Sequence, residues 1–173
     1  KVANRRALDL ALPQAEADAN TSIISFDGNN FGKVNKIVNE LEGDKVLQKM
    51  ANAIGQAADE FGVGARVFRR GGDEFVAIAP KNVALKLQRR AEEIFGQAEY
   101  SNNKESVTVS LSGTIGNTFE EANNILQEAK KKRKQEFVEP PAPEFLRNST
   151  PGRAIEDAQL HTEVEQILRE DSK

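Results

Sequence analysis

A glycine pair, Gly71 and Gly72, separates two apolar, β-prone segments, and no other feature of the sequence constrains the fold as strongly. The flanking segments, residues 64–70 and 74–79, place Val, Phe and Ile where strands favour them. Glycine reaches the positive φ of a tight hairpin turn without a Cβ clash. The sequence therefore predicts a β-hairpin over these two segments, with Gly71 and Gly72 in its turn.

Acidic side chains occur at two strand ends. Asp73 and Glu74 follow the glycine pair directly, although acids are poor strand formers. A short buried strand predicted over residues 22–27 ends at Asp27 and runs into a Gly/Asn-rich turn. Carboxylates at two adjacent strand ends can form a Mg²⁺ site, because Mg²⁺ prefers oxygen ligands and takes one or two protein carboxylates. The alternative is a solvated hairpin tip and an unrelated strand-end acid.

These residues resemble the GGDEF family of diguanylate cyclases, which join two GTP molecules into cyclic di-GMP. The resemblance extends from residue 3 to about residue 138 and rests on one motif and three upstream residues: Gly71–Phe75, Asp27, Asn35 and Asp44. It implies a site for Mg²⁺ or Mn²⁺ with Asp27 and Asp73 as ligands, helped by the backbone carbonyl of Gly28. Glu74 would be the second essential acid, on the metal or near the attacking hydroxyl.

Asn35 and Asp44 match the positions that contact guanine in this family. A carboxylate can accept hydrogen bonds from the N1–H and the exocyclic amine of guanine, and an Asn amide can both donate and accept. Two structural alternatives remain open. Asp44 stands where a helix N-cap belongs, and Asn35 could be a polar residue on an exposed helix face.

Phosphate contacts are expected in two places. The turn after Asp27 leads into a predicted helix N-terminus, where free amides and the helix dipole suit a triphosphate. Three residues of this turn are candidates: Asn30, Phe31 and Lys33. Lys130 and Lys134 lie four residues apart, hence on one helical face, and match basic positions late in the family. The alternative for these lysines is a basic run at a helix C-terminus, which the dipole favours in any case.

The chain departs from the family pattern at several positions. Asn29 stands where the family has a second Asp, and Gly32 stands where it has a Lys. The feedback-inhibition site of many such cyclases is an Arg-x-x-Asp shortly before the glycine pair, and Gly62 and Ala65 replace these two residues. We therefore expect no inhibitory site and no product inhibition through it.

The predicted elements indicate an α+β fold. Helices are expected over residues 3–18 (with Pro13 as an interruption), 31–41, 82–97, after Gly43-Asp44 and after Thr118, and strands over 22–27, 64–70, 74–79, 107–111 and, as a possible last strand, 135–138. A hairpin inside split βαβ units predicts a ferredoxin-like or palm-type, antiparallel-containing sheet with helices on one side. The central hairpin would carry residues 71–75.

Three segments are expected along the chain: a GGDEF-like nucleotidyl cyclase domain at 1–138, a Pro-rich linker at 139–150 and an amphipathic helix at 151–173. The last helix could pack back on the domain, continue into a further module, or pair with its copy in a dimer. The chain begins with Lys1 instead of Met, so we expect it to be fused to further domains.

Composition excludes several classes of function. A net charge of −3 argues against a general nucleic-acid binder. The chain has no cysteine, and its single histidine, His161, lies in the terminal segment, which excludes thiolate and His-clustered sites in the main domain. No apolar run approaches the roughly 18–20 residues of a membrane span, and nothing resembles a signal peptide. We expect no membrane segment in this chain and a cytoplasmic location.

Three functional hypotheses follow. The first is a diguanylate cyclase in which two copies, each holding one GTP, face each other as a homodimer. The second is a catalytically degenerate GGDEF domain that binds GTP, or nothing, and regulates a neighbouring module. The third is another palm-type nucleotidyltransferase that makes a different cyclic or linear product. Asn35 and Asp44 favour guanine and argue against ATP as its substrate.

Overall fold

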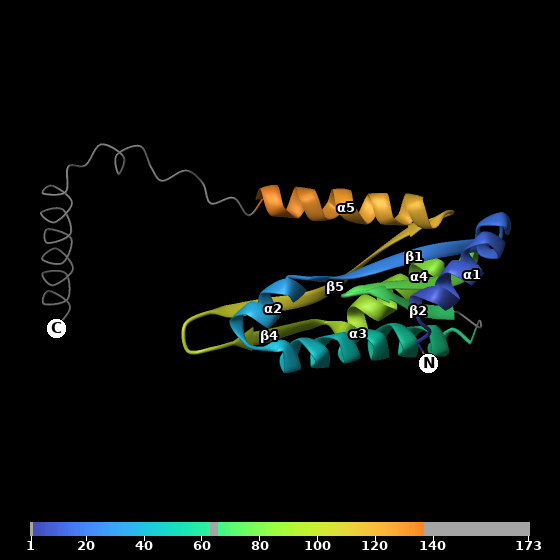
Figure 1. Cartoon of the computed structure of the whole chain (residues 1–173). Helices are drawn as coiled ribbons and strands as arrows, with labels where there is room; N and C mark the ends of the chain where they lie inside the picture. The colour runs from blue at the N-terminus through green and yellow to red at the C-terminus, as the bar shows by residue number, and fades with distance from the viewer. Residues whose placement is uncertain (1, 63–65, 137–173) are drawn as a thin grey trace, which may run out of the picture. The chain divides into compact units, whose positions relative to one another are not determined.

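The computed structural model describes residues 2–62 and 66–136 of the chain (Figure 1). Contacts group residues 1–132 into one compact unit and residues 133–173 into a second, of which only 133–136, the end of the last helix, is described. The predicted linker and terminal helix, at 139–150 and 151–173, lie outside the described residues.

The described ranges contain five helices and five strands. The helices are α1 (Arg5–Ala17), α2 (Phe31–Ile37), α3 (Glu40–Glu60), α4 (Lys81–Phe95) and α5 (Phe119–Glu136). The strands are β1 (Thr21–Asn29), β2 (Arg66–Gly71), β3 (Glu74–Pro80), β4 (Gln97–Ser101) and β5 (Ser106–Gly116). They form one antiparallel sheet in the order β2-β3-β1-β5-β4. The α+β class is confirmed, and the hairpin β2–β3 is the one predicted around the glycine pair.

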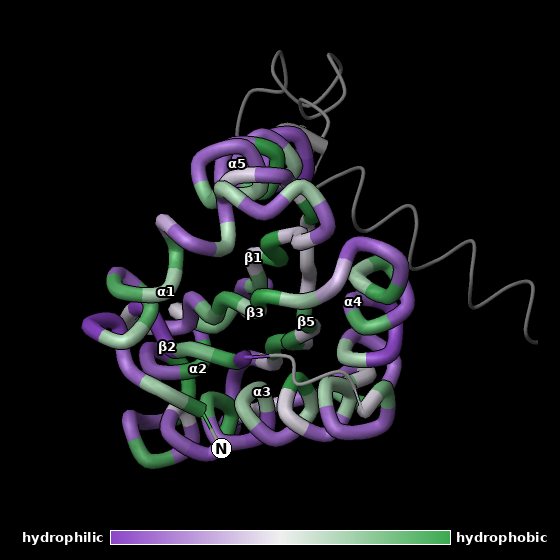
Figure 2. The backbone as a smooth tube through the Cα atoms, turned by 90° about the vertical axis from the view of Figure 1, so that its right-hand side faces the viewer, coloured by the Kyte–Doolittle hydropathy of each residue, from purple (hydrophilic) through white to green (hydrophobic). Residues whose placement is uncertain are grey.

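The central strands β1 and β3 are buried on both faces, so the sheet needs cover on both sides. One face packs on α3 and α4 through residues that include Ile24, Phe26 and Ala77. The other face packs on α1 through Ile23, Val76 and Ile78. Figure 2 shows the hydrophobic strand segments enclosed by helices whose outer turns are hydrophilic. The prediction of helices on one side only is therefore wrong.

The helix that carries Asp44 begins earlier than the sequence suggested. Asn39 is the N-cap of α3, and its side-chain Oδ1 accepts a hydrogen bond of 2.9 Å from the backbone N–H of Glu42. Asp44 lies inside the helix with an exposed side chain. The interpretation of Asp44 as the N-cap is wrong, because Asn39 already supplies the capping oxygen.

Four further boundaries differ from expectation. Strand β1 continues to Asn29, so Asp27 lies inside the strand and not at its end. Helix α1 is continuous through Pro13. The edge strand β4 was not predicted, because Gln97–Ser101 is too polar for a strand signal. Gln135 and Glu136 belong to α5 and form no last strand, whereas Val138 lies outside the described residues.

The capping assignment makes a testable prediction. Asn39→Ala should lower the free energy of unfolding by about 1 kcal/mol, because it leaves a helix N–H without its partner. Asp44→Ala should change it by less than about 0.5 kcal/mol, as is usual for an exposed position. Urea denaturation of both variants measures this difference. A larger loss for Asp44→Ala than for Asn39→Ala would contradict the assignment.

Candidate active site

The ends of β1 and β3 bring the three predicted acids together. Phe26 pairs with Phe75 in the register of these strands, so the next residues, Asp27 and Glu74, are neighbours on the opposite face. Asp73 lies one residue earlier, in the hairpin turn, close enough to raise the pKa of Asp27 electrostatically. Asp27 is 3% exposed, whereas Asp73 and Glu74 are half-buried.

The hairpin turn consists of Gly72 and Asp73. Gly71 is the last residue of β2 and pairs with Glu74, and only Gly72 of the two glycines has a positive φ, of 50°. Arg69 Nε donates a 3.0 Å hydrogen bond to the Gly72 carbonyl and fixes the turn. The prediction that Gly71 and Gly72 both lie in the turn is therefore wrong by one residue, because the turn consists of Gly72 and Asp73. A Cβ at Gly71 would meet nothing within 4 Å, so no described contact requires glycine there.

Two protein cations pair with the acids. Lys130 Nζ of α5 lies 2.5 Å from Asp27 Oδ2, and Arg70 Nη1 lies 2.6 Å from Glu74 Oε2. The contact of Lys130 with the buried carboxylate of Asp27 is an ion pair. Lys130, which the sequence suggested as a phosphate contact, therefore lies at the acidic site.

Burial dominates the electrostatics of the site. It raises the pKa of Asp27 to about 6; Lys130 opposes this shift, while Asp73 and Glu74 add to it. Burial also raises the pKa of Asp73, against the opposing effects of its backbone hydrogen bond and of Lys130. Both carboxyls are therefore held in an environment that disfavours their charge unless a cation is close.

The donor set fits a hard divalent ion that keeps some of its own water. Within the described ranges, no group of three or more His, Cys, Asp or Glu side chains could hold a metal by itself. The buried carboxylate of Asp27, which pairs with Lys130, lies within electrostatic range of a second carboxylate on Asp73. Mg²⁺ is commonly held by one or two carboxylates together with substrate phosphates and water, which these residues can supply.

The predicted guanine-binding residues lie at neighbouring positions of two helices. A Cβ at Gly43 would collide with Asn35 Oδ1, so the side chain of Asn35 lies against α3 one residue from Asp44. Both Asn35 and Asp44 are exposed and open to a ligand. The absence of a side chain at Gly43 is what allows α2 to bring Asn35 so close.

A cavity of about 770 Å³ connects Asp44 with the hairpin. Its wall contains predicted site residues Asp44, Gly71 and Gly72, and also Leu47, Phe75, Arg69, Arg70, Gln48, Ala51 and residues 2–5. The first residues reach this position because Ala3 hydrogen-bonds to β2 at Val67 and Arg69. The volume is sufficient for a small-molecule ligand.

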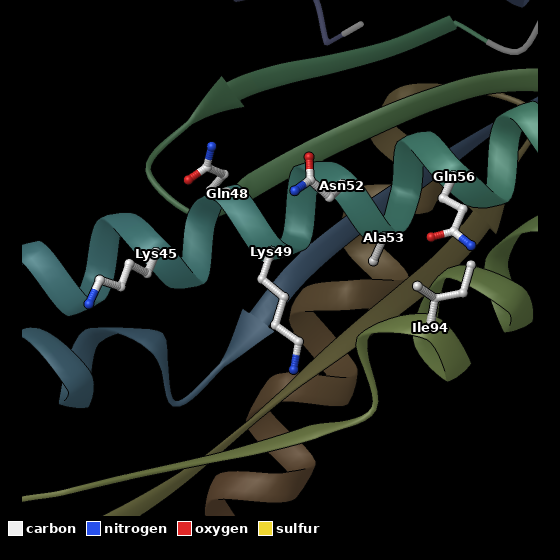
Figure 3. Close-up of a pocket in the computed structure, with 7 residues that line it drawn as sticks. All are labelled: Lys45, Gln48, Lys49, Asn52, Ala53, Gln56 and Ile94. Atoms are coloured by element: carbon white, nitrogen blue, oxygen red, sulfur yellow. The ribbon is translucent and has the colours of Figure 1, made fainter.

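A second, smaller pocket of about 280 Å³ lies on the outer side of α3, against Ile94 of α4. Figure 3 shows Lys45, Lys49 and the amide side chains Gln48, Asn52 and Gln56 projecting from this helix. Lys49 Nζ lies 4.7 Å from the centre of the Phe95 ring. None of the predicted site residues lines this pocket.

The other predicted site residues lie at the following positions in the structure. Asn30 adopts a left-handed conformation at φ 63° before α2, and its side chain donates to the Thr108 carbonyl. Phe31 packs against the main core, Lys33 is exposed, and Lys134 is exposed in the last turn of α5. Gly62, at the replaced inhibitory site, is exposed with a positive φ of 58°, and Ala65 lies outside the described residues.

Sequence reasoning missed two contacts near the site. Arg70 was not singled out, although a cation four residues before Glu74 is a visible signal. The side chain of Asn29, which replaces the family's second Asp, donates hydrogen bonds to Ser110 Oγ (2.8 Å) and Ser112 Oγ (2.7 Å) of β5. Asn29 therefore ties β1 to β5.

Comparison with known proteins identifies the family. The family model described as "Diguanylate cyclase, GGDEF domain" matches residues 1–136, and the chain belongs to this family. It is 30% identical over 121 residues to the diguanylate cyclase DosC of Escherichia coli (strain K12); the match covers 65% of this chain and 26% of DosC. The chain thus spans about a quarter of the length of that relative.

Solved structures agree on the fold. The GGDEF domain of DgcB from Caulobacter crescentus, determined in complex with c-di-GMP, is 24% identical with a TM-score of 0.61, covering 76% of this chain and 86% of that one. The active GGEEF domain of a diguanylate cyclase from Vibrio cholerae is 21% identical with a TM-score of 0.63, covering 76% and 93%. No helix in the part of the chain that the structure describes has the length and apolarity to cross a membrane.

The raised pKa of Asp27 predicts a pH-dependent stability of the metal-free protein. In the unfolded chain the pKa would be about 3.9, so the native state binds this proton more tightly. The stabilisation is complete below pH of about 4 and is lost as the pH rises through about 6. Asp27→Asn should therefore raise the free energy of unfolding at pH 7.5 by about 1–3 kcal/mol and change it little at pH 4.

Urea denaturation in the presence of a chelator, at both pH values, checks this expectation. Asp59→Asn is a suitable control, because Asp59 is an exposed acid on α3. Destabilisation of Asp27→Asn at pH 7.5 would show that the pair with Lys130 outweighs the burial of the carboxylate.

Proposed function

We propose that this chain is the catalytic module of a diguanylate cyclase, which binds GTP with a divalent metal ion and condenses two GTP molecules into cyclic di-GMP and two pyrophosphates. The observation that carries this proposal is the meeting of Asp27, Asp73 and Glu74 at the hairpin whose glycines, together with Asp44, line the large cavity. Membership of the family and the similarity to DosC support it.

The chemistry consists of two equivalent displacements. In each, the 3′-oxygen of one GTP forms a bond to the α-phosphorus of the other, the bond from that phosphorus to pyrophosphate breaks, and the 3′-hydroxyl loses its proton. A divalent ion, Mg²⁺ or Mn²⁺, would neutralise phosphate charge and make the hydroxyl more acidic. Asp27, Asp73 and the Gly28 carbonyl would hold this ion, with Glu74 on it or beside the hydroxyl.

The remaining site residues would position the nucleotide. The Asp44 carboxylate accepts from the N1–H and amine of guanine, and the Asn35 amide completes the base contacts. Lys130 contacts the phosphates from α5, and four further candidates extend this contact: Asn30, Phe31, Lys33 and Lys134. The open backbone at Gly71 lets a phosphate approach closely.

Each copy holds one GTP, so the two nucleotides react only where two copies face each other around a two-fold axis. The catalytic domain would comprise residues 1–138, followed by a linker at 139–150 and a helix at 151–173. We place the protein in the cytoplasm, where GTP is available, and expect it to be fused to further domains.

A regulatory, non-catalytic role is the second candidate. Asn29 offers no carboxylate where the family has its second Asp, and its amide is held by Ser110 and Ser112. Gly32 offers no cation to the phosphates. A domain of this kind would bind GTP without converting it.

The first test is an incubation of the chain, at high protein concentration, with GTP and Mg²⁺, followed by chromatographic separation of the products. We expect cyclic di-GMP, and a loss of at least about a hundredfold in rate for Asp73→Ala, because one ligand of the catalytic ion is missing. Asp59→Ala, which removes an exposed acid from α3, should retain the wild-type rate.

The outcome separates the two candidates. Magnesium-dependent GTP binding without product would support the regulatory role and overturn the cyclase. Equal rates for wild type and Asp73→Ala would exclude the acidic site as the origin of any product.

A second test concerns base recognition. Asp44→Ala should weaken GTP binding by about 10–100-fold, because it removes charge-assisted hydrogen bonds to the base. ATP binding should change little, so the preference for GTP over ATP should disappear. Calorimetry with both nucleotides measures it, and an unchanged preference would remove Asp44 from the guanine site.

A further inference from the structure

Arg70 contacts both the acidic site and the start of the helix that supplies Lys130. Its guanidinium is paired with Glu74 at 2.6 Å and lies over the Phe119 ring, 5.0 Å from the ring centre. Phe119 is the first residue of α5, and its backbone N–H donates to Glu16 of α1. The start of α5 is therefore tied to α1, the Phe119 side chain packs against the core on this side of the sheet, and its ring contacts the guanidinium by a cation–π interaction.

Arg70 also lies on the wall of the large cavity. It stands directly before Gly71, where the pairing of β2 with β3 shifts register. Such a bulge bends the strand and re-aims its side chains. Arg70 thus forms part of the wall of the cavity that contains Asp44, and its guanidinium pairs with the Glu74 carboxylate.

The charges of the acidic site are nearly balanced. Asp27 is paired with Lys130, and Glu74 is paired with Arg70. Asp73, the third acid, lies in the electrostatic range of Lys130 and of Arg69. A free divalent ion therefore meets carboxylates whose charge is already compensated, and it must displace a protein cation to bind.

From this balance we infer that Arg70 is a positioning residue that withholds Glu74 from a free divalent ion, so that the metal enters the site together with a nucleoside triphosphate. The triphosphate brings the negative charge that the guanidinium needs when it leaves Glu74. A guanidinium suits this exchange, because its fork of N–H donors matches phosphate oxygens as well as carboxylate oxygens. The inference rests on the proposed function and adds that the metal ion and the nucleotide bind together.

Binding of Mn²⁺ to the full chain, measured by electron paramagnetic resonance with and without 3′-deoxy-GTP, tests this inference. The nucleotide lacks the attacking hydroxyl, so the readout is independent of turnover. For the wild type we expect weak Mn²⁺ binding alone and an affinity at least about twentyfold higher with the nucleotide. Arg70→Gln should bind Mn²⁺ alone about tenfold more tightly, because one positive charge near the ion is removed. Since coupling is reciprocal, the nucleotide effect should fall to less than about fivefold.

Two further variants make the result specific. Arg66→Gln removes the same charge from the exposed, far end of β2 and should change Mn²⁺ affinity by less than about twofold. Arg70→Lys keeps the charge and should retain most of the coupling. If Arg70→Gln does not fold, Arg70→Lys replaces it in this test. Loss of the guanidinium fork in Arg70→Lys still predicts a rise in Mn²⁺ affinity of about twofold to threefold.

The outcomes distinguish this inference from the proposed function. If the wild type binds Mn²⁺ and 3′-deoxy-GTP cooperatively but Arg70→Gln leaves free Mn²⁺ affinity unchanged or weaker, the role of Arg70 is overturned and the cyclase proposal stands. If the wild type binds neither ligand, both are overturned. The role of Arg70 would be established if Arg70→Gln, but not Arg66→Gln, binds free Mn²⁺ more tightly and shows weaker coupling between Mn²⁺ and the nucleotide.

Discussion

The pairing of β1 with β3 through Phe26 and Phe75 determines where every acid of the site lies. Both rings are almost fully buried between the sheet and the helices α3 and α4. Burial of each side chain contributes about 1.5–3 kcal/mol. A shift of one residue in this register would turn Phe26 to the opposite face and put Asp27 into the core. The hydrophobic register thus holds Asp27 beside Glu74 on two inner strands of the sheet.

The same arrangement lowers the stability of the folded protein at the site. Asp27 is buried with a raised pKa, and Lys130 and Arg70 compensate its charge and that of Glu74. Proteins commonly accept such a loss of stability where function requires closely spaced like charges. The cations also tie the site to α5, since Lys130 lies on this helix and Arg70 stacks on its first residue. Acids, hairpin and α5 therefore form one connected group.

Much of the fold could be predicted because the local signals agree with the global arrangement. The glycine pair placed the hairpin, and the apolar stripe of Val46, Leu47, Met50 and Ile54 placed the buried face of α3. The errors come from competing signals. Asp44 looked like a helix cap, yet Asn39 is the residue with the free oxygen at the helix start. The helices were expected on one side of the sheet, although β1 and β3 carry apolar residues on both faces and so require cover on both.

The sequence by itself determined the hairpin, the identity of the three acids and the family to which they belong, because these depend on residue types at short spacing. Only the tertiary structure decided which groups meet. Three contacts join elements that are distant along the chain or lie on different turns. Asn35 lies so close to Gly43 that a side chain there would collide with it. Asp27 pairs with Lys130, and Arg70 contacts both Glu74 and Phe119. Such contacts follow from strand register and helix packing, which local sequence does not encode.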